Sequence, residues 1–209
     1  MLALAYSYGF VFSILGIATV LDKLKIFNDE GSRKFIHIGV SNWWIIAMLL
    51  FEPNEYYLAM IPPATFIVLN YLSYKFNLVK SMERDEQSAN DLGTVYYAAS
   101  LFIITFFAFR LNMLEAGAVA ILAMGYGDGL AAVIGKHFKS KNLYQNKTLY
   151  GVITMFTSTL VIGFIFFPHL WALMIIVAIF ATLVELYTPK GLDNLSVALL
   201  IFLLLVIIL

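Results

Sequence analysis

Long, continuously apolar runs separated by short polar segments dominate the pattern of this chain. A helix needs roughly 20 apolar residues to cross the hydrocarbon core of a bilayer, with a range of about 17–25. The runs do not alternate between apolar and polar positions, which argues against a membrane β-barrel. The pattern predicts an all-α, polytopic integral membrane bundle of about eight transmembrane helices. The expected spans are 4–21, 35–51, 56–73, 92–109, 114–135, 151–167, 170–187 and 192–209.

The basic residues indicate how this bundle is oriented. Twelve of the 13 lysines and arginines fall in alternating segments, 22–34, 74–91, 136–150 and 188–191. The opposite loops hold only Arg110. Because cytoplasmic loops carry the excess of Lys and Arg, these segments are expected inside and both termini outside. We therefore expect a single transmembrane domain over residues 1–209, in the cell (inner) membrane, with a cytoplasmic-facing active site.

Composition agrees with a membrane protein and excludes several functions. Hydrophobic residues make up 62% of the chain, against roughly 45–50% in soluble domains. The chain has no cysteine, which excludes disulfides, thiolate metal sites and a cysteine nucleophile. Its formal net charge is zero, which argues against a basic surface that binds nucleic acid.

The stretch "GSRKFIHIG" places Arg33, Lys34 and His37 at the mouth of the second predicted helix. His37 lies four residues after Arg33 and three after Lys34, so it neighbours both on the helix surface. Interfacial snorkelling is an ordinary explanation for Arg33 and Lys34. It explains His37 less well, because that residue lies one turn deeper.

The stretch "GYGDG" places Asp128 inside an apolar run, with Gly125, Gly127 and Gly129 around it. Glycine disfavours a helix by about 1 kcal/mol per residue, so three in five residues predict a bend, a break or the close approach of another helix. A charged side chain at membrane depth marks a functional site by default. The alternative is a carboxylate that satisfies backbone groups freed at a kink. Glycine beside an acid also suits a divalent ion and phosphates.

Two later stretches add polar groups at helix ends. In "YQNKTLYG", Lys147 and Thr148 precede the sixth predicted helix, where a lysine, a hydroxyl and a helix N-terminus can bind an anion. Such pairs are also common at ordinary helix starts. In "TLVELYTPKGLDNLS", Glu185 ends the seventh helix, whereas Asp193 and Asn194 open the eighth. The last two residues could be an ordinary cap.

The most polar stretch, "KSMERDEQSANDLGTVYY", leads into the fourth predicted helix. Asn90 or Asp91 could cap that helix. The acids of the stretch could hold Arg84 or a metal. A solvated loop explains them equally well. These acids are Glu83, Asp85, Glu86 and Asp91.

Acids and bases are thus expected together on the cytoplasmic side. Three acids can supply the oxygen ligands that Mg²⁺ prefers: Asp128, Glu185 and Asp193. Three bases can hold phosphate oxygens: Arg33, Lys34 and Lys147. This set suits phosphoryl or nucleotidyl transfer. Neither a Walker A loop nor the protein-kinase signatures occur in the chain.

Five stretches in this order resemble the polyprenol kinase family, which includes dolichol kinase and phytol kinase and uses CTP to phosphorylate lipid alcohols. They are "SRKFIHIG", "GTVYYA", "GYGDGLAAVIGKHF", "NKTLYG" and "ATLVELYTPKGLDNLSVALL", spread over residues 32–203. The Gly-Asp and Lys-Thr pieces also look like the phosphatidate cytidylyltransferases. One position departs from the pattern: Tyr150 stands where many relatives have Glu.

The resemblance implies a CTP and Mg²⁺ site on the cytoplasmic side. Asp128 would hold the metal with help from Glu185 or Asp193. The nucleotide and its phosphates would contact Arg33, Lys34, Gly127, Gly129, Lys147, Thr148 and Asn194. The catalytic residues expected are Asp128, His37 and Lys147, with His37 or a carboxylate as the base for the hydroxyl.

Several alternatives stay open at this point. The acceptor alcohol could be phytol, farnesol, geranylgeraniol, a longer polyprenol or diacylglycerol. A cytidylyltransferase would instead take a lipid phosphate and release pyrophosphate. A transporter would need polar access from both sides, and the outer face offers only Glu52, Glu55, Arg110, Glu115 and His169.

Overall fold

The computed structural model describes residues 1–76 and 92–209. Within these residues the regular structure is helical, and the β-structure is limited to an isolated bridge between Asn142 and Thr148. The helices are α1 (Leu2–Lys23), α2 (Asp29–Ser41), α3 (Trp43–Leu50), η1 (Pro53–Glu55), α4 (Tyr56–Ala59), α5 (Ile61–Phe76), α6 (Gly93–Arg110), α7 (Leu114–His137), α8 (Leu149–Phe166), η4 (Pro168–Leu170), α9 (Trp171–Tyr187) and α10 (Asp193–Ile208).

Five of the described helical segments are long and apolar enough to cross a membrane. They are α1, α6, α7, α8 and the η4–α9 segment, and α10 is a shorter apolar helix. This confirms the predicted all-α, polytopic membrane architecture. The total of eight spans stays a prediction, because α2, α3 and α5 are each shorter than these segments.

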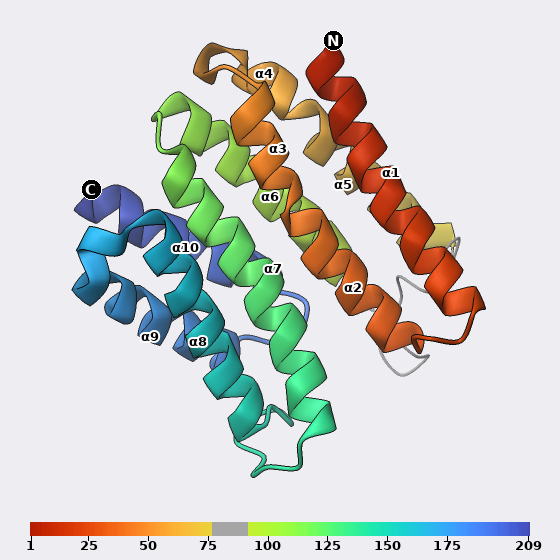
Figure 1. Ribbon diagram of the computed structural model, residues 1–209, viewed down its shortest axis with the longest axis vertical. Coiled ribbons are helices and arrows are strands. Elements are labelled where there is room, and N and C mark those ends of the chain that lie inside the picture. The colour runs from red at the N-terminus through yellow and green to blue at the C-terminus, as the bar shows by residue number, and fades with distance from the viewer. Residues whose placement is uncertain (77–91) are drawn as a thin grey trace.

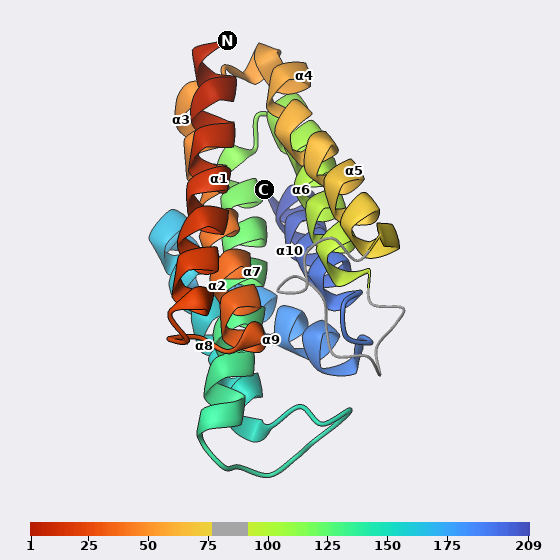
Figure 2. The same ribbon diagram turned by 90° about the vertical axis from the view of Figure 1, so that its right-hand side faces the viewer.

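Helix α7 is the central element of the bundle. It packs against α2, α3, α6, α8 and α10, and Figure 1 shows it between the α1–α3 side and the α8–α9 side. The helices run alternately up and down, so both ends of the chain lie in the upper half of Figures 1 and 2. The α1–α2 turn and the α7–α8 loop lie at the lower end, and they belong to the basic segments 22–34 and 136–150 that are predicted to be cytoplasmic.

Two of the predicted spans are interrupted. The span expected over 35–51 is divided at Asn42, whose side-chain amide donates a hydrogen bond to the Ile38 carbonyl at 2.8 Å. Side chains that bond to nearby backbone in this way compete with the regular helix. The span expected over 56–73 is divided after Met60. Helix α5 then begins with prolines at its second and third residues, where their missing N–H groups cost nothing.

The glycines of "GYGDG" do not break α7, which is continuous from Leu114 to His137. Of the expected outcomes, close approach is the one observed, because a Cβ atom at each glycine would collide with a side chain of a neighbouring helix. A Cβ atom would collide with Ser41 of α2 at Gly125, with Met155 of α8 at Gly127, and with Ile38 of α2 at Gly129. The helix remains intact because packing against α2 and α8 offsets the weak helix propensity of glycine.

A similar close approach lies further up α7 and gives the first testable prediction. A Cβ at Gly117 would overlap the ring of Trp44, which is fully buried and donates its indole N–H to the Leu114 carbonyl at 3.1 Å. Gly117→Ala should therefore destabilise the bundle by about 1–3 kcal/mol. Thermal unfolding in detergent measures the loss. Gly9→Ala on α1 is the matched control, since no atom lies within 4 Å of its new methyl group. Equal melting temperatures for the two variants would contradict the packing argument.

Candidate functional site

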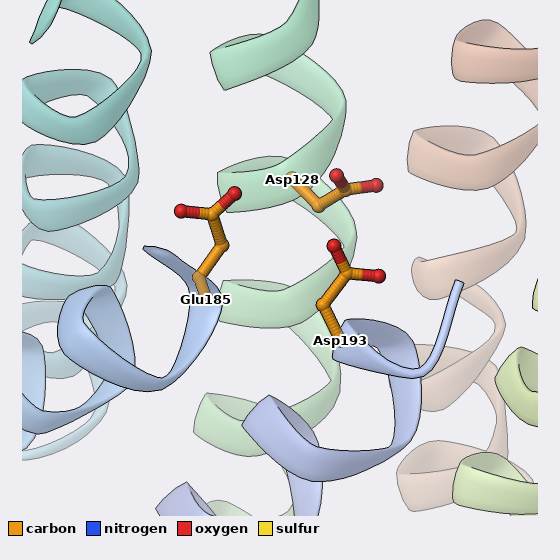
Figure 3. Close-up of side chains that lie close together, drawn as sticks. All are labelled: Asp128, Glu185 and Asp193. Carbon is orange, nitrogen blue, oxygen red and sulfur yellow. The ribbon is translucent and has the colours of Figure 1, made fainter. Parts of the chain in front are cut away.

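Three carboxylates from separate parts of the chain meet at the lower half of the bundle. Asp128 lies on α7, Glu185 near the end of α9 and Asp193 at the start of α10. One oxygen of each lies within 4.8 Å of the others, and Figure 3 shows the three side chains around a common space. Glu185 and Asp193 are both buried. Carboxylate oxygens at this spacing could hold a divalent metal ion.

A cation and an imidazole from α2 contact Asp128. The Lys34 Nζ atom lies 2.5 Å from Asp128 Oδ2, and the Lys34 side chain is only 4% exposed. The His37 Nε2 atom lies 3.4 Å from the same oxygen. The Tyr97 hydroxyl donates a hydrogen bond to the backbone carbonyl of His37 at 2.9 Å, which fixes α2 against α6. The three-residue spacing predicted from the sequence thus brings Lys34 and His37 to one carboxylate.

Lys147 contacts the other two acids. Its Nζ atom lies 2.8 Å from Glu185 Oε1 and 3.4 Å from Asp193 Oδ2, and it also donates to the backbone carbonyl of Glu185. The second Asp193 oxygen accepts the backbone N–H of Gly191 at 2.9 Å. Gly191 has φ 93°, a conformation that L side chains rarely adopt. The "PKG" turn therefore positions Asp193 through a glycine.

These groups line a polar cavity of about 700 Å³, including its open mouth. Its wall carries four acids and four lysines: Glu30, Asp128, Glu185, Asp193, Lys34, Lys136, Lys147 and Lys190. Each of the three central carboxylates contacts a lysine ammonium: Asp128 contacts Lys34, whereas Glu185 and Asp193 contact Lys147. Such a wall can bind both a cation and an anion without an uncompensated charge.

The N-terminus of α8 forms another part of the same wall. The Thr148 hydroxyl accepts the backbone N–H of Gly151 at 3.2 Å and so caps the helix. Helices α7 and α8 are in close contact here, because a Cβ at Gly135 would lie 2.5 Å from the Thr148 hydroxyl. A helix N-terminus beside Lys147 can bind phosphate oxygens. Gly127 and Gly129 face neighbouring helices and do not line this cavity.

Three predicted site residues, Arg33, His37 and Asn194, line not the polar cavity but a different one. It is mainly apolar, measures about 830 Å³ including its open mouth, and lies between α1, α2, α5 and α6. Arg33 and Asn194 line it, together with His37 and Lys34. Arg33 pairs with Glu30 at 2.6 Å, and Asn194 donates its side-chain amide to the Gly93 carbonyl at 3.0 Å. Arg33 and Asn194 do not line the polar cavity, so their contact with nucleotide phosphates stays a prediction.

Sequence reasoning did not select Glu30 and Lys136, which pair across α2 and α7 with 3.2 Å between Lys136 Nζ and Glu30 Oε2. Burial raises the pKa of the Glu30 carboxyl, but the Arg33 guanidinium and the Lys136 ammonium outweigh it, so the net pKa lies below its usual value. The three-residue spacing of Glu30 and Arg33 was the available signal. No sequence signal marked Lys136 as a site residue, because exposed lysines are ordinary at helix ends.

The unusual residue of the Lys-Thr motif lies outside the cavity. Tyr150 is exposed, does not line the polar cavity, and packs its ring edge-on against Phe138. The departure at this position therefore leaves the three-acid cluster intact. The acids predicted in the stretch before the fourth predicted helix, Glu83 to Asp91, lie outside the described residues.

Comparison with known proteins finds relatives along almost the whole chain. A phytol kinase of Synechocystis sp. is 27% identical over 209 residues, covering 95% of this chain and 88% of the relative. Phytol kinase 1, chloroplastic, of Arabidopsis thaliana is 28% identical, covering 74% of this chain and 56% of the relative. Farnesol kinase, chloroplastic, of the same plant is 24% identical, covering 70% and 50%. No family model and no solved structure matches the chain.

The chain resembles the phytol kinases. The resemblance inferred from five short motifs is therefore confirmed, and it extends beyond those motifs. The chain spans about half the length of the two plant relatives but most of the cyanobacterial one. Each of these relatives is named a kinase; a relation to the cytidylyltransferases is not shown.

The geometry around Lys147 gives a second prediction. Lys147→Met leaves Glu185 and Asp193 buried without their cation, and breaking a buried pair costs about 3–5 kcal/mol. The melting temperature should fall by roughly 6–20 °C, at about 2–4 °C per kcal/mol. Adding Glu185→Gln should restore part of the loss, because one buried charge is removed.

Lys141→Met is the control for this experiment, since Lys141 lies in the same loop and is exposed. It should melt like the unaltered protein. A double variant that melts lower than Lys147→Met alone would show that the carboxylate does not depend on this lysine.

Proposed function

We propose that this protein is a CTP-dependent kinase that transfers a phosphoryl group to the hydroxyl of a prenyl alcohol in the membrane. The observation that carries the proposal is the three-carboxylate cluster in contact with Lys34 and Lys147, in a chain similar to a phytol kinase over 95% of its length. The product would be the lipid monophosphate, and CDP would leave. The excess of lysine and arginine at the same end of the bundle supports an active site on the cytoplasmic side of a cell membrane.

The acids fit a magnesium ion by the chemistry of their donors. Asp128, Glu185 and Asp193 offer hard carboxylate oxygens within 4.8 Å of one another, which suits Mg²⁺ together with phosphate oxygens and water. When held by these carboxylates, Mg²⁺ would supply positive charge that offsets the negative charge of the transferring group. Each carboxylate contacts a lysine ammonium. The positive charge of a bound metal ion could therefore replace the charge of the lysine beside each carboxylate.

The lysines would then serve the triphosphate. Lys34 and Lys147 lie on opposite sides of the carboxylate cluster, one on α2 and one before α8. With the carboxylates holding the metal, both ammonium groups would be able to contact phosphate oxygens, and the N-terminus of α8 would add backbone donors. Catalysis by such a set consists mainly of positioning and electrostatic stabilisation.

His37 is the group we assign to the acceptor hydroxyl. Its side chain is 10% exposed and faces both Asp128 and the apolar cavity. The alcohol oxygen would attack the terminal phosphorus while the bond from that phosphorus to the bridging oxygen breaks. The hydroxyl proton would pass to His37 Nε2, and the bridging oxygen would leave as part of CDP. Phosphorus, charge and proton are then all accounted for.

The proposal predicts a specific reaction. Purified protein with Mg²⁺, CTP labelled at the γ-phosphate and a series of prenyl alcohols should give labelled lipid. Asp128→Asn should lower the rate by about 10³-fold or more, because it removes a central metal ligand. Thin-layer chromatography of the lipid fraction measures both.

Glu115→Gln is the matched control, because Glu115 lies on the same helix but is exposed near its other end. It should keep the full rate. Release of pyrophosphate from CTP only when phosphatidate is supplied would replace the kinase with a cytidylyltransferase. Wild-type turnover by Asp128→Asn would contradict the metal assignment.

Metal binding can be measured without turnover. Mn²⁺, which shares the oxygen preference of Mg²⁺, should bind the protein in a titration followed by electron paramagnetic resonance. Glu185→Gln should weaken that binding by about tenfold or more, whereas Glu115→Gln should not change it. Equal affinity in the two variants would show that the cluster does not hold the metal.

A further inference from the structure

The apolar cavity between α1, α2, α5 and α6 has one polar end and one apolar end. Lys34, His37 and Asn194 line it close to Asp128. Trp43 and Pro62 line the other end, about one and a half turns further along α2 and its continuation α3. A cavity with this polarity matches a molecule that has a hydroxyl head and a hydrocarbon chain.

Unsatisfied polar atoms distinguish the polar end. Within the described residues, His37 Nε2 and Asn194 Oδ1 are buried and make no hydrogen bond, although His37 Nε2 lies 3.4 Å from Asp128 Oδ2. Both residues line this cavity. Buried polar groups in proteins are nearly always hydrogen-bonded, so each such atom calls for a partner. A hydroxyl can donate to one of these atoms and accept a hydrogen bond from the Lys34 ammonium. The indole N–H of Trp43 is a third unpartnered atom, at the apolar end.

We propose that this cavity binds the acceptor alcohol, with the hydroxyl between His37 and Asn194 and the first isoprene units along α2 and α6 toward Trp43. The assignment rests on the proposed kinase function for the identity of the head group. Lys34 lines both the polar and the apolar cavity. It therefore marks the place where the hydroxyl would meet the terminal phosphate.

The cavity is short compared with a long isoprenoid. Along α6 it extends from Gly93 to Leu101, eight residues or roughly 12 Å of helix. It encloses the part of the chain next to the hydroxyl, and the remainder passes between the helices into the bilayer. Specificity should therefore depend on the isoprene units nearest the hydroxyl more than on total chain length.

A second apolar groove provides an internal comparison. It lies along α7 and α8, measures about 990 Å³ including its open mouth, and is lined by Val161 and Thr157. Val40→Phe fills the cavity proposed here, and Val161→Phe places the same side chain in the other groove. Val40→Phe should raise the KM for farnesol about tenfold and leave the KM for CTP unchanged. Val161→Phe should change neither value.

A photoreactive alcohol tests the location without variants and without turnover. A prenyl alcohol carrying a diazirine on its second isoprene unit should label peptides of α2, α5 or α6, and excess farnesol should suppress the labelling. Labelling confined to α7 and α8, or a farnesol KM raised by Val161→Phe alone, would overturn the assignment. If no alcohol is phosphorylated but farnesol still competes for the label, the kinase proposal fails and the cavity assignment stands.

Discussion

The structure depends on holding three carboxylates together in the lower half of an apolar bundle, where Glu185 and Asp193 are buried and Asp128 is partly buried. A buried carboxylate without a partner is costly, and removal of one member of a buried pair destabilises a protein by several kcal/mol. Here Lys34 contacts Asp128 from a position 94 residues away in the chain, and Lys147 contacts Glu185 and Asp193. The first pair fixes the depth of α2 relative to α7, and the other two fix the start of α8 relative to α9 and α10. The charge arrangement and the helix packing therefore cannot change independently.

Small residues on α7 make that arrangement possible. Gly125 and Gly129 face α2, and Gly127 faces α8, each with no space for a Cβ atom. A larger side chain would push α2 outward and move Lys34 away from Asp128. The glycines that look like a helix break in the sequence are thus the means by which a continuous helix carries a charged site. Their contribution to a nucleotide site would come through this packing and not through direct contact.

The sequence predicted the elements that follow from composition and local pattern. Alternation of the helices places the second half of α7, the end of α9 and the start of α10 at the same end of the bundle, so the meeting of Asp128 with Glu185 and Asp193 was predictable without coordinates. The division of a span at Asn42 was not, because it depends on one side chain bonding to the backbone. The hydrogen bond from the Asn194 side chain to α6 could not be predicted from the sequence. It depends on how α10 is rotated about its axis, which is set by its packing against α6 and α7.

The separation of polar and apolar cavities addresses a physical difficulty of the proposed reaction. A lipid alcohol must bring its hydroxyl to a charged phosphate, yet its chain gains nothing from entering water. Lys34 and His37 lie one turn apart on α2, so a single turn of helix borders both environments. The hydroxyl can then reach the phosphate while the chain stays among apolar side chains. Because the Lys34 side chain is only 4% exposed, its attraction to a phosphate would be stronger there than in solution.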